Sequence, residues 1–382
     1  FPAFLGLLTM KYCSVVPREI VEHYGDEFGR NPVGTGPFHF KMWREGEKLI
    51  FRKNPHYFEK DDQGNRLPYL DAVSITFITD KQSEFLEFIK GELDFLSGLS
   101  PANKDELLTR AGKLNPRYEG EIKLYTQPYL NTEYLGFLVD DSMERVQNSP
   151  VSDKLVRQAI NYGFDRKNMM KYLRNNIGTP ANHGFIPKGL PAFSKDSVQG
   201  YTYNPDKARS LLEKAGYPQG EGLEPIKLTT TDDYRDLCEF IQHQLSEIGI
   251  EINIEISTGA TFRDMVANSK LLFFRGSWIA DYADAENYLA LFYSKNFSPG
   301  GPNYTHYENP EYDSLYEKAL NTMDPEKRQK YYHQMDRMII EDAPIVPLYY
   351  DQVVRFTHTN IKNLGNNPMN LLELKHVKKV NQ

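Results

Sequence analysis

The sequence predicts an α/β protein built from two lobes, and three observations lead to that fold class. The chain has 382 residues, more than one ordinary domain holds, so two domains are expected. A strand–helix–strand pattern lies at residues 226–256, inside a region where helices and strands alternate. β-rich segments lie on both sides of that region. We expect residues 131–350 to form an α/β lobe, and residues 1–130 with 351–382 to form a β-rich lobe.

The first ninety residues predict strands and one helix. The runs His39–Trp43, Lys48–Lys53 and Asp71–Ile78 are rich in β-branched and aromatic residues. Segments with Gly, Pro, Asn or Asp precede or separate them, as turns require. A helix is predicted over Gln82–Lys90, because its apolar residues share one face and Gly91 ends it.

Further strands and helices follow toward the middle of the chain. Glu121–Gln127 and Asn131–Val139 are predicted strands, and Ser152 is the predicted N-cap of the next helix. Pro205 opens another helix and Gly216 ends it.

The clearest local signal is a βαβ unit. Ile226–Thr230 and Ile250–Ile256 are predicted strands, with a helix over Asp233–Ile248 between them. Such a crossover implies a parallel pair. A further strand, Leu271–Phe274, is predicted to lead into a loop over Gly276–Asp284.

The last part of the chain predicts two helices, Pro310–Thr322 and Pro325–Glu341, and the strand Ile345–Tyr350. The tail, with strands Val353–His358 and Leu371–Val377, is too short to fold alone. We expect it to return to the first lobe, which gives two crossings that form a hinge. Ligands favour clefts between domains joined in this way.

Composition excludes several function classes. A net charge of -7 argues against a nucleic-acid-binding protein, and 40% apolar with 25% charged residues is typical of a soluble globular chain. The apolar run Phe1–Met10 is too short to span a membrane and has no basic flank. Cys13 and Cys238 are open to either a disulfide or two free thiols.

No motif predicts covalent chemistry or a cofactor. The nine histidines form no HExxH pair, there is no Cys-x-x-Cys, and no G-x-S-x-G motif occurs. The paired acids stand where turns or helix caps favour Asp. We therefore predict no metal, no cofactor and no enzyme activity, and keep a peptide or glycan hydrolase only as a third hypothesis.

The most informative segment is the loop predicted after Phe274. It holds an arginine, an adaptable glycine, a tryptophan, two acids and a tyrosine, namely Arg275, Gly276, Trp278, Asp281, Tyr282 and Asp284. It leaves the end of a predicted strand, where open α/β sheets bind ligands.

A peptide offers an ammonium group and a carboxylate, so Asp281 is the candidate for the first and Arg275 for the second. The alternative is structural: Asp284 caps the helix that starts near Glu286, and Trp278 packs in the interior.

Several motifs together resemble one known family. They are, in order, Asn31–Phe38, Arg52–Phe58, Gly91–Asp94, Val156–Tyr162 with Asp165-Arg166, Ala208–Gly216, Gly276–Asp284 and Ala343–Tyr350. Their order and spacing are similar to those of the extracellular solute-binding proteins that include periplasmic oligopeptide- and dipeptide-binding proteins.

The resemblance implies a type II periplasmic-binding fold that captures a peptide and hands it to the permease subunits of an ABC importer. It also implies that Asp281 pairs with the peptide's α-ammonium group and Arg275 with its carboxylate. Tyr129, Tyr134 and Tyr349 or Tyr350 are implied to line the cleft.

Departures from the family pattern set further expectations. The usual N-terminal segment has no counterpart, so we expect an incomplete first lobe, and lipid anchoring stays open. A monomer in the periplasm or cell envelope, with no nucleic-acid partner, is expected. The main alternative is the same fold with another cargo, an oligosaccharide or a nickel or haem complex.

Overall fold

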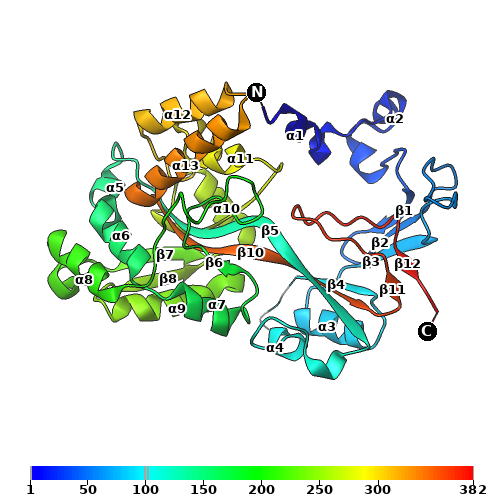
Figure 1. Ribbon diagram of the computed structural model, residues 1–382, viewed down its shortest axis with the longest axis horizontal. Coiled ribbons are helices and arrows are strands. Elements are labelled where there is room, and N and C mark those ends of the chain that lie inside the picture. Colours follow the sequence, from blue (N-terminus) through cyan, green and yellow to red (C-terminus); the bar gives the residue numbers. More distant parts are fainter. Residues whose placement is uncertain (1, 99, 101–102, 382) are drawn as a thin grey trace. The chain divides into compact units, whose positions relative to one another are not determined.

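The computed structural model describes residues 2–98, 100 and 103–381. Its internal contacts divide the chain into two units, a larger one (Phe1–Leu7 with Pro128–Gln352) and a smaller one (Leu8–Gln127 with Val353–Gln382). The chain passes between the units within strands β5 (Ile122–Phe137) and β10 (Ile345–His358), the long cyan and orange-red strands of Figure 1. The sequence had assigned the first seven residues to the other lobe, and their contacts group them with the larger unit.

The smaller unit contains an antiparallel sheet in the order β1-β2-β3. Its strands are β1 (Phe38–Arg44), β2 (Lys48–Lys53) and β3 (Ala72–Thr76), close to the predicted ranges. The predicted helix is α3 (Lys81–Ile89). Gly91 follows it with φ of 83°, a conformation that glycine adopts at little cost.

The remaining elements of the first 120 residues and of the tail are short. They are α1 (Phe4–Leu8), α2 (Arg18–Tyr24), β4 (Phe95–Ser97), α4 (Lys104–Leu107), β11 (Ile361–Lys362) and β12 (Lys378–Lys379). The strand predicted over Leu371–Val377 is wrong, because the pairing with β11 begins only at Lys378.

The sheet of the larger unit has the order β10-β5-β9-β7-β8. Strand β7 (Ile226–Thr230) pairs parallel with β8 (Ile252–Ile256), and α9 (Arg235–Ser246) connects them. This confirms the predicted βαβ unit. Strand β9 (Phe273–Ile279) runs antiparallel to β5, over a register from Asn131↔Ile279 to Phe137↔Phe273.

The other elements of the larger unit connect and cover this sheet. They are α5 (Glu144–Gln147), α6 (Lys154–Tyr162), α7 (Arg166–Leu173), β6 (Thr179–Pro180), α8 (Pro205–Lys214), α10 (Gly259–Ala267), α11 (Glu286–Leu289), α12 (Pro310–Leu320) and α13 (Pro325–Asp342). Ser152 is not the N-cap predicted for α6. It lies in a preceding turn, and the Asp153 carboxylate accepts the Leu155 N–H at 2.7 Å instead.

The main core lies between one face of the sheet and helices α6 to α9. The stacked rings of Phe137 and Phe273, 4.4 Å apart, are part of it, and so are Ile160, Leu212 and Ile241 from the helices. Burial of each such side chain contributes about 1.5–3 kcal/mol to the free energy of folding. The packed helices therefore stabilise the sheet.

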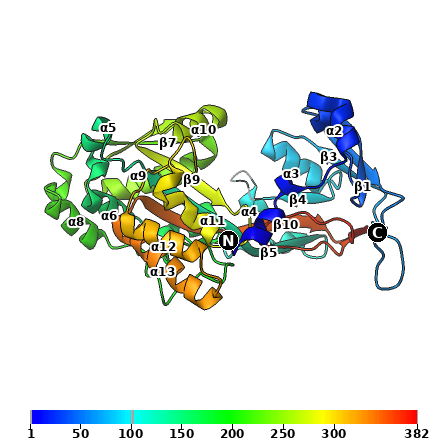
Figure 2. The ribbon, with the colours of Figure 1, turned by 90° about the horizontal axis from the view of Figure 1, so that it is seen from above.

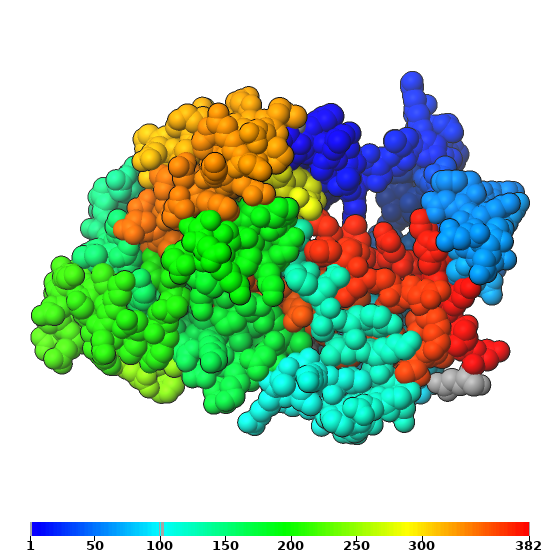
Figure 3. All heavy atoms as spheres, viewed as in Figure 1, coloured from blue at the N-terminus to red at the C-terminus, as the bar shows by residue number. Residues whose placement is uncertain are grey.

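Helices α12 and α13 lie side by side in both ribbon views (Figures 1 and 2). On α13, Asp336 accepts the backbone N–H of Phe185 at 2.7 Å, which fastens the helix to the segment after β6. Figure 3 shows the same junction on the surface, where the orange residues of these helices meet green residues of the same unit.

Candidate functional site

A cavity of about 640 Å³ opens in the larger unit, at the carboxyl ends of the parallel strands β7 and β8. This is where open α/β sheets usually bind ligands. Its lining comes from β5, the ends of β7 and β8, α10 and β9, with Tyr304 added from a loop: Tyr134, Thr231–Tyr234, Ser257–Gly259, Phe262, Arg263, Val266, Ala267, Phe274–Trp278 and Tyr304.

Two glycine–aromatic pairs face each other across the β5–β9 ladder, and three of their four residues, Tyr134, Phe274 and Gly276, line the cavity. Tyr134 stands opposite Gly276, and Gly136 stands opposite Phe274. A Cβ atom at position 276 would lie 2.4 Å from the Tyr134 ring, and one at position 136 would lie 2.6 Å from the Phe274 ring. Gly276 is thus required by close packing, because it leaves room for Tyr134 to lie across the neighbouring strand.

Arg275 lines the cavity but is already paired inside the protein. Its guanidinium forms an ion pair with Glu133 on β5, and the two side chains are 13% and 4% exposed. The guanidinium also lies 3.3 Å from the centre of the Tyr234 ring. Burial raises the pKa of Tyr234 to about 12, so its phenol stays protonated. The predicted pairing of Arg275 with a ligand carboxylate stays a prediction, and its charge is compensated before any ligand binds.

The Arg275–Glu133 pair belongs to a larger buried network. Ser277 donates to both Asn131 and Glu133 at 3.0 Å. Asn131 donates to Asp351 at 3.4 Å, and Asp351 also accepts a hydrogen bond from Arg174 at 2.7 Å. Asn131, Thr132 and Glu133 are consecutive polar residues on β5 and all three are buried, so no alternation in the sequence marked them. Sequence reasoning missed all of these partners except Arg275, because they come from segments far apart in the chain.

Asp281 lies two residues after the end of β9 and is exposed. The predicted loop begins later than expected, because residues 275–279 continue the strand paired with β5. The Asp281 backbone N–H donates to Asn287 Oδ1 at 3.0 Å, and its carboxylate lies 3.4 Å from Asn287 Nδ2. Within the described residues no lysine or arginine forms an ion pair with it. Asp281 is not part of the cavity lining, although Trp278, three residues before it, is. Burial, and then the Asp281 charge, raise the pKa of Tyr304, a lining residue.

The other candidates of this segment have internal partners. Trp278 is a lining residue of the cavity, and its indole N–H donates to Asn287 Oδ1 at 3.0 Å. Asp284 accepts the Glu286 N–H at 2.9 Å, as expected for a capping acid, although the N-cap residue of α11 is Ala285. Tyr282 is buried and donates to the Glu286 carboxylate.

The tyrosines implied by the family resemblance fall into two groups. Tyr134 lines the cavity. Tyr349 and Tyr350 are each about 1% exposed, and the Tyr350 hydroxyl donates to the Gly184 carbonyl at 2.8 Å. Tyr129 is half-buried and is not part of the cavity lining. Ligand contact by Tyr129, Tyr349 and Tyr350 stays a prediction.

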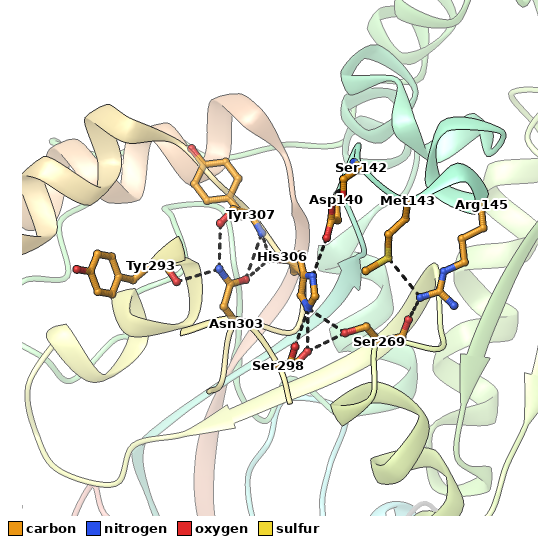
Figure 4. A network of polar contacts seen from close by, with 11 residues as sticks. Asp140, Ser142, Met143, Arg145, Ser269, Tyr293, Ser298, Asn303, His306 and Tyr307 are labelled. Atoms are coloured by element: carbon orange, nitrogen blue, oxygen red, sulfur yellow. Dashed lines mark hydrogen bonds and ion pairs between the residues drawn. The ribbon is translucent and has the colours of Figure 1, made fainter. Parts of the chain in front are cut away.

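A cluster with serine, histidine and aspartate occurs elsewhere in the larger unit (Figure 4). His306 Nδ1 lies 2.9 Å from Asp140 Oδ2, and Nε2 lies 2.9 Å from Ser269 Oγ and 3.0 Å from the Ser298 carbonyl oxygen. Both serines are buried, at 6% and 5% exposure, and neither lines the cavity described above. The cluster ties three loops together and offers no substrate-accessible nucleophile.

The described part of the chain also bears on metal binding and membrane crossing. Among these residues, no group of three or more His, Cys, Asp or Glu side chains is arranged to hold a metal ion. Within the same residues, no helix combines the length and the apolar character that a bilayer crossing requires.

Comparison with known proteins decides the family. The family model described as bacterial extracellular solute-binding proteins, family 5 Middle, matches residues 1–300. The chain belongs to this family. As a family 5 member it is a solute-binding protein of the ABC-transporter type and not an enzyme, and it has the predicted type II periplasmic-binding fold.

Relatives of this family 5 protein include the glutathione-binding protein GsiB of Salmonella choleraesuis (strain SC-B67). The two are 28% identical over 367 residues, which cover 94% of this chain and 67% of GsiB.

Solved structures share the fold. The periplasmic binding protein DppA from Helicobacter pylori, in complex with the peptide STSA, matches with a TM-score of 0.79 and 24% identity over 98% of this chain and 69% of that chain. The dipeptide-binding protein from Pseudoalteromonas sp. SM9913, in complex with Met-Leu, matches with a TM-score of 0.79 and 22% identity, over 99% and 72%.

Proposed function

We propose that this protein binds peptides and delivers them to the permease subunits of an ABC importer. GsiB is named for glutathione, and the two solved structures above hold a tetrapeptide and a dipeptide. The proposal extends that ligand class to this chain because of one observation, the state of Asp281.

The Asp281 carboxylate is exposed and has no ion-pair partner within the described residues. Its backbone is held by Asn287, so its position is set before a ligand arrives. A ligand ammonium group provides the missing counter-charge, and the pair gains strength as ligand binding removes water from it.

The β9 backbone supplies the second part of the recognition. Among the described residues, β9 pairs with β7 at a single position, Phe274 with Thr229, whereas it pairs with β5 along its whole length. Within the described residues, Gly276, Ser277 and Trp278 therefore have no ladder partner on β7. These three residues line the cavity. An extended peptide binds such an edge through main-chain hydrogen bonds.

Calorimetry with the full-length protein tests the proposal, using Ala-Ala-Ala, its N-acetylated form and glutathione. Asp281→Ala and Asp281→Asn are expected to weaken binding of Ala-Ala-Ala by about 2–5 kcal/mol, the range for loss of one partner of a desolvated charge pair. The matched control is Asp206→Ala, on the exposed surface of α8, which is expected to leave binding unchanged.

N-acetyl-Ala-Ala-Ala is expected to bind the unaltered protein as weakly as the free peptide binds Asp281→Ala. Equal affinities for the free and the acetylated peptide would contradict an ammonium site at Asp281. Binding of an oligosaccharide in the absence of any peptide binding would favour the alternative cargo.

A further inference from the structure

We propose that Arg263 determines specificity by binding a carboxylate of the solute, so that the protein prefers peptides with an anionic group at this cavity. The inference rests on the proposed peptide-binding function and adds the chemical class of peptide that is preferred.

Of the two arginines that line the cavity, Arg263 is the one whose charge has no partner in the described part of the chain. It lies on α10, is exposed and lines the cavity. Among the described residues it forms no hydrogen bond, ion pair or ring contact. Arg275, the other arginine of the lining, is neutralised by Glu133. A ligand carboxylate therefore meets an available counter-charge at Arg263 and a compensated one at Arg275.

The absence of a side chain at Gly259 leaves room for the Arg263 guanidinium. Arg263 Nη1 lies 3.5 Å from the position that a Cβ atom at residue 259 would occupy. Both residues line the cavity, so the guanidinium lies over the first turn of α10, at the cavity wall. A larger side chain at position 259 would compete for that space.

The first turn of α10 adds to the same preference. Thr258 makes no side-chain cap, and its hydroxyl bonds to the Thr261 hydroxyl at 3.0 Å instead. The first N–H groups of a helix have no acceptor within the helix, and this end of its dipole attracts anions. Arg263 and the N-terminus of α10 thus both favour an anion on the α10 side of the cavity.

Other lining residues also favour binding of an anion on the α10 side of the cavity. Phe262, Val266 and Phe274 supply apolar lining, which strengthens a charge pair by excluding water. Asp233, on another lining segment, has no ion-pair partner within the described residues and repels a carboxylate. The α10 wall is therefore the favourable end of the cavity for a negative group.

Two matched probe pairs test the inference by calorimetry on the full-length protein: Ala-Glu-Ala with Ala-Gln-Ala, and Ala-Ala-Ala with its C-terminal amide. The unaltered protein is expected to prefer the carboxylate member of at least one pair by about tenfold. Arg263→Gln is expected to remove that preference, and Arg263→Lys to keep part of it. Arg209→Gln, an exposed arginine on α8 outside the cavity, is the control and keeps it in full.

The outcomes separate this inference from the proposed function. Peptide binding without a carboxylate preference, or with a preference that survives Arg263→Gln, overturns the role of Arg263 alone. Failure of all four peptides to bind overturns the peptide-binding function and this inference with it. Added salt is expected to reduce the preference, because an exposed charge is screened.

Discussion

Asn287 Oδ1 accepts the indole N–H of Trp278 and the backbone N–H of Asp281, each at 3.0 Å. Asn287 lies on α11 and is buried. One side-chain oxygen therefore fixes both the tryptophan of the cavity lining and the acid proposed to bind the ligand ammonium group. Asn287 is a positioning residue for Asp281.

Asn287→Ala is expected to lower the free energy of unfolding by about 1–3 kcal/mol, because two donors lose their acceptor. It is also expected to weaken binding of Ala-Ala-Ala while leaving the weaker binding of the N-acetylated peptide unchanged. Urea denaturation and calorimetry measure the two effects. Asn321→Ala, which removes an exposed side chain, is the control. A stability loss with no difference between the two peptides would show that Asn287 acts on folding alone.

Glu133→Gln is expected to destabilise the protein by about 3–5 kcal/mol, because it leaves the Arg275 guanidinium buried without its counter-charge. The double variant Glu133→Gln/Arg275→Gln is expected to recover part of that loss in urea denaturation. Glu255→Gln removes an exposed ion pair with Lys227 and is expected to cost less than about 1 kcal/mol. Equal effects of the two single glutamate variants would contradict the burial argument.

Gly276→Ala is expected to cost about 1–3 kcal/mol, since the added Cβ collides with the Tyr134 ring and the strands must shift. Gly34→Ala is the matched control, because nothing lies within 4 Å of its added Cβ. Thermal unfolding measures both. A Gly276→Ala variant as stable as the parent would mean that Tyr134 moves aside freely.

Stability is expected to fall as the pH rises from about 4 to 7, through Asp336. Burial raises its pKa to about 7 from an ordinary 3.8, although N–H bonds from Phe185 and Ile186 act the other way. Because the folded state holds this proton more tightly than the unfolded state, the contribution is complete below pH 3.8 and is lost as the pH passes 7.

Asp336→Asn is expected to flatten that part of the pH profile, an effect on the order of a few kcal/mol. Urea denaturation at several pH values measures it, with the exposed Asp206→Asn as control. A profile that stays as steep in Asp336→Asn would assign the dependence to another group.

The elements set by local chemistry were predicted from the sequence. The βαβ unit, the helix opened by Pro205 and the bond from the Glu286 N–H to Asp284 follow from side-chain periodicity and from donors a few residues away. The error at Ser152 was a shift of one residue to Asp153, because both residue types cap helices well. The candidate acid, Asp281, was also proposed from sequence, mainly through the resemblance of its loop to that of the family.

Tertiary structure alone decided which charges are available to a ligand. Glu133 and Arg275 are 142 residues apart, and the β5–β9 register brings them together, so no local pattern showed that Arg275 is neutralised. The same register extends β9 to Ile279. Arg263 carries no motif, and only the packing of α10 beside the strand ends places it at the cavity. Local preferences determine which elements form, whereas the state of a charge depends on neighbours that only the folded chain supplies.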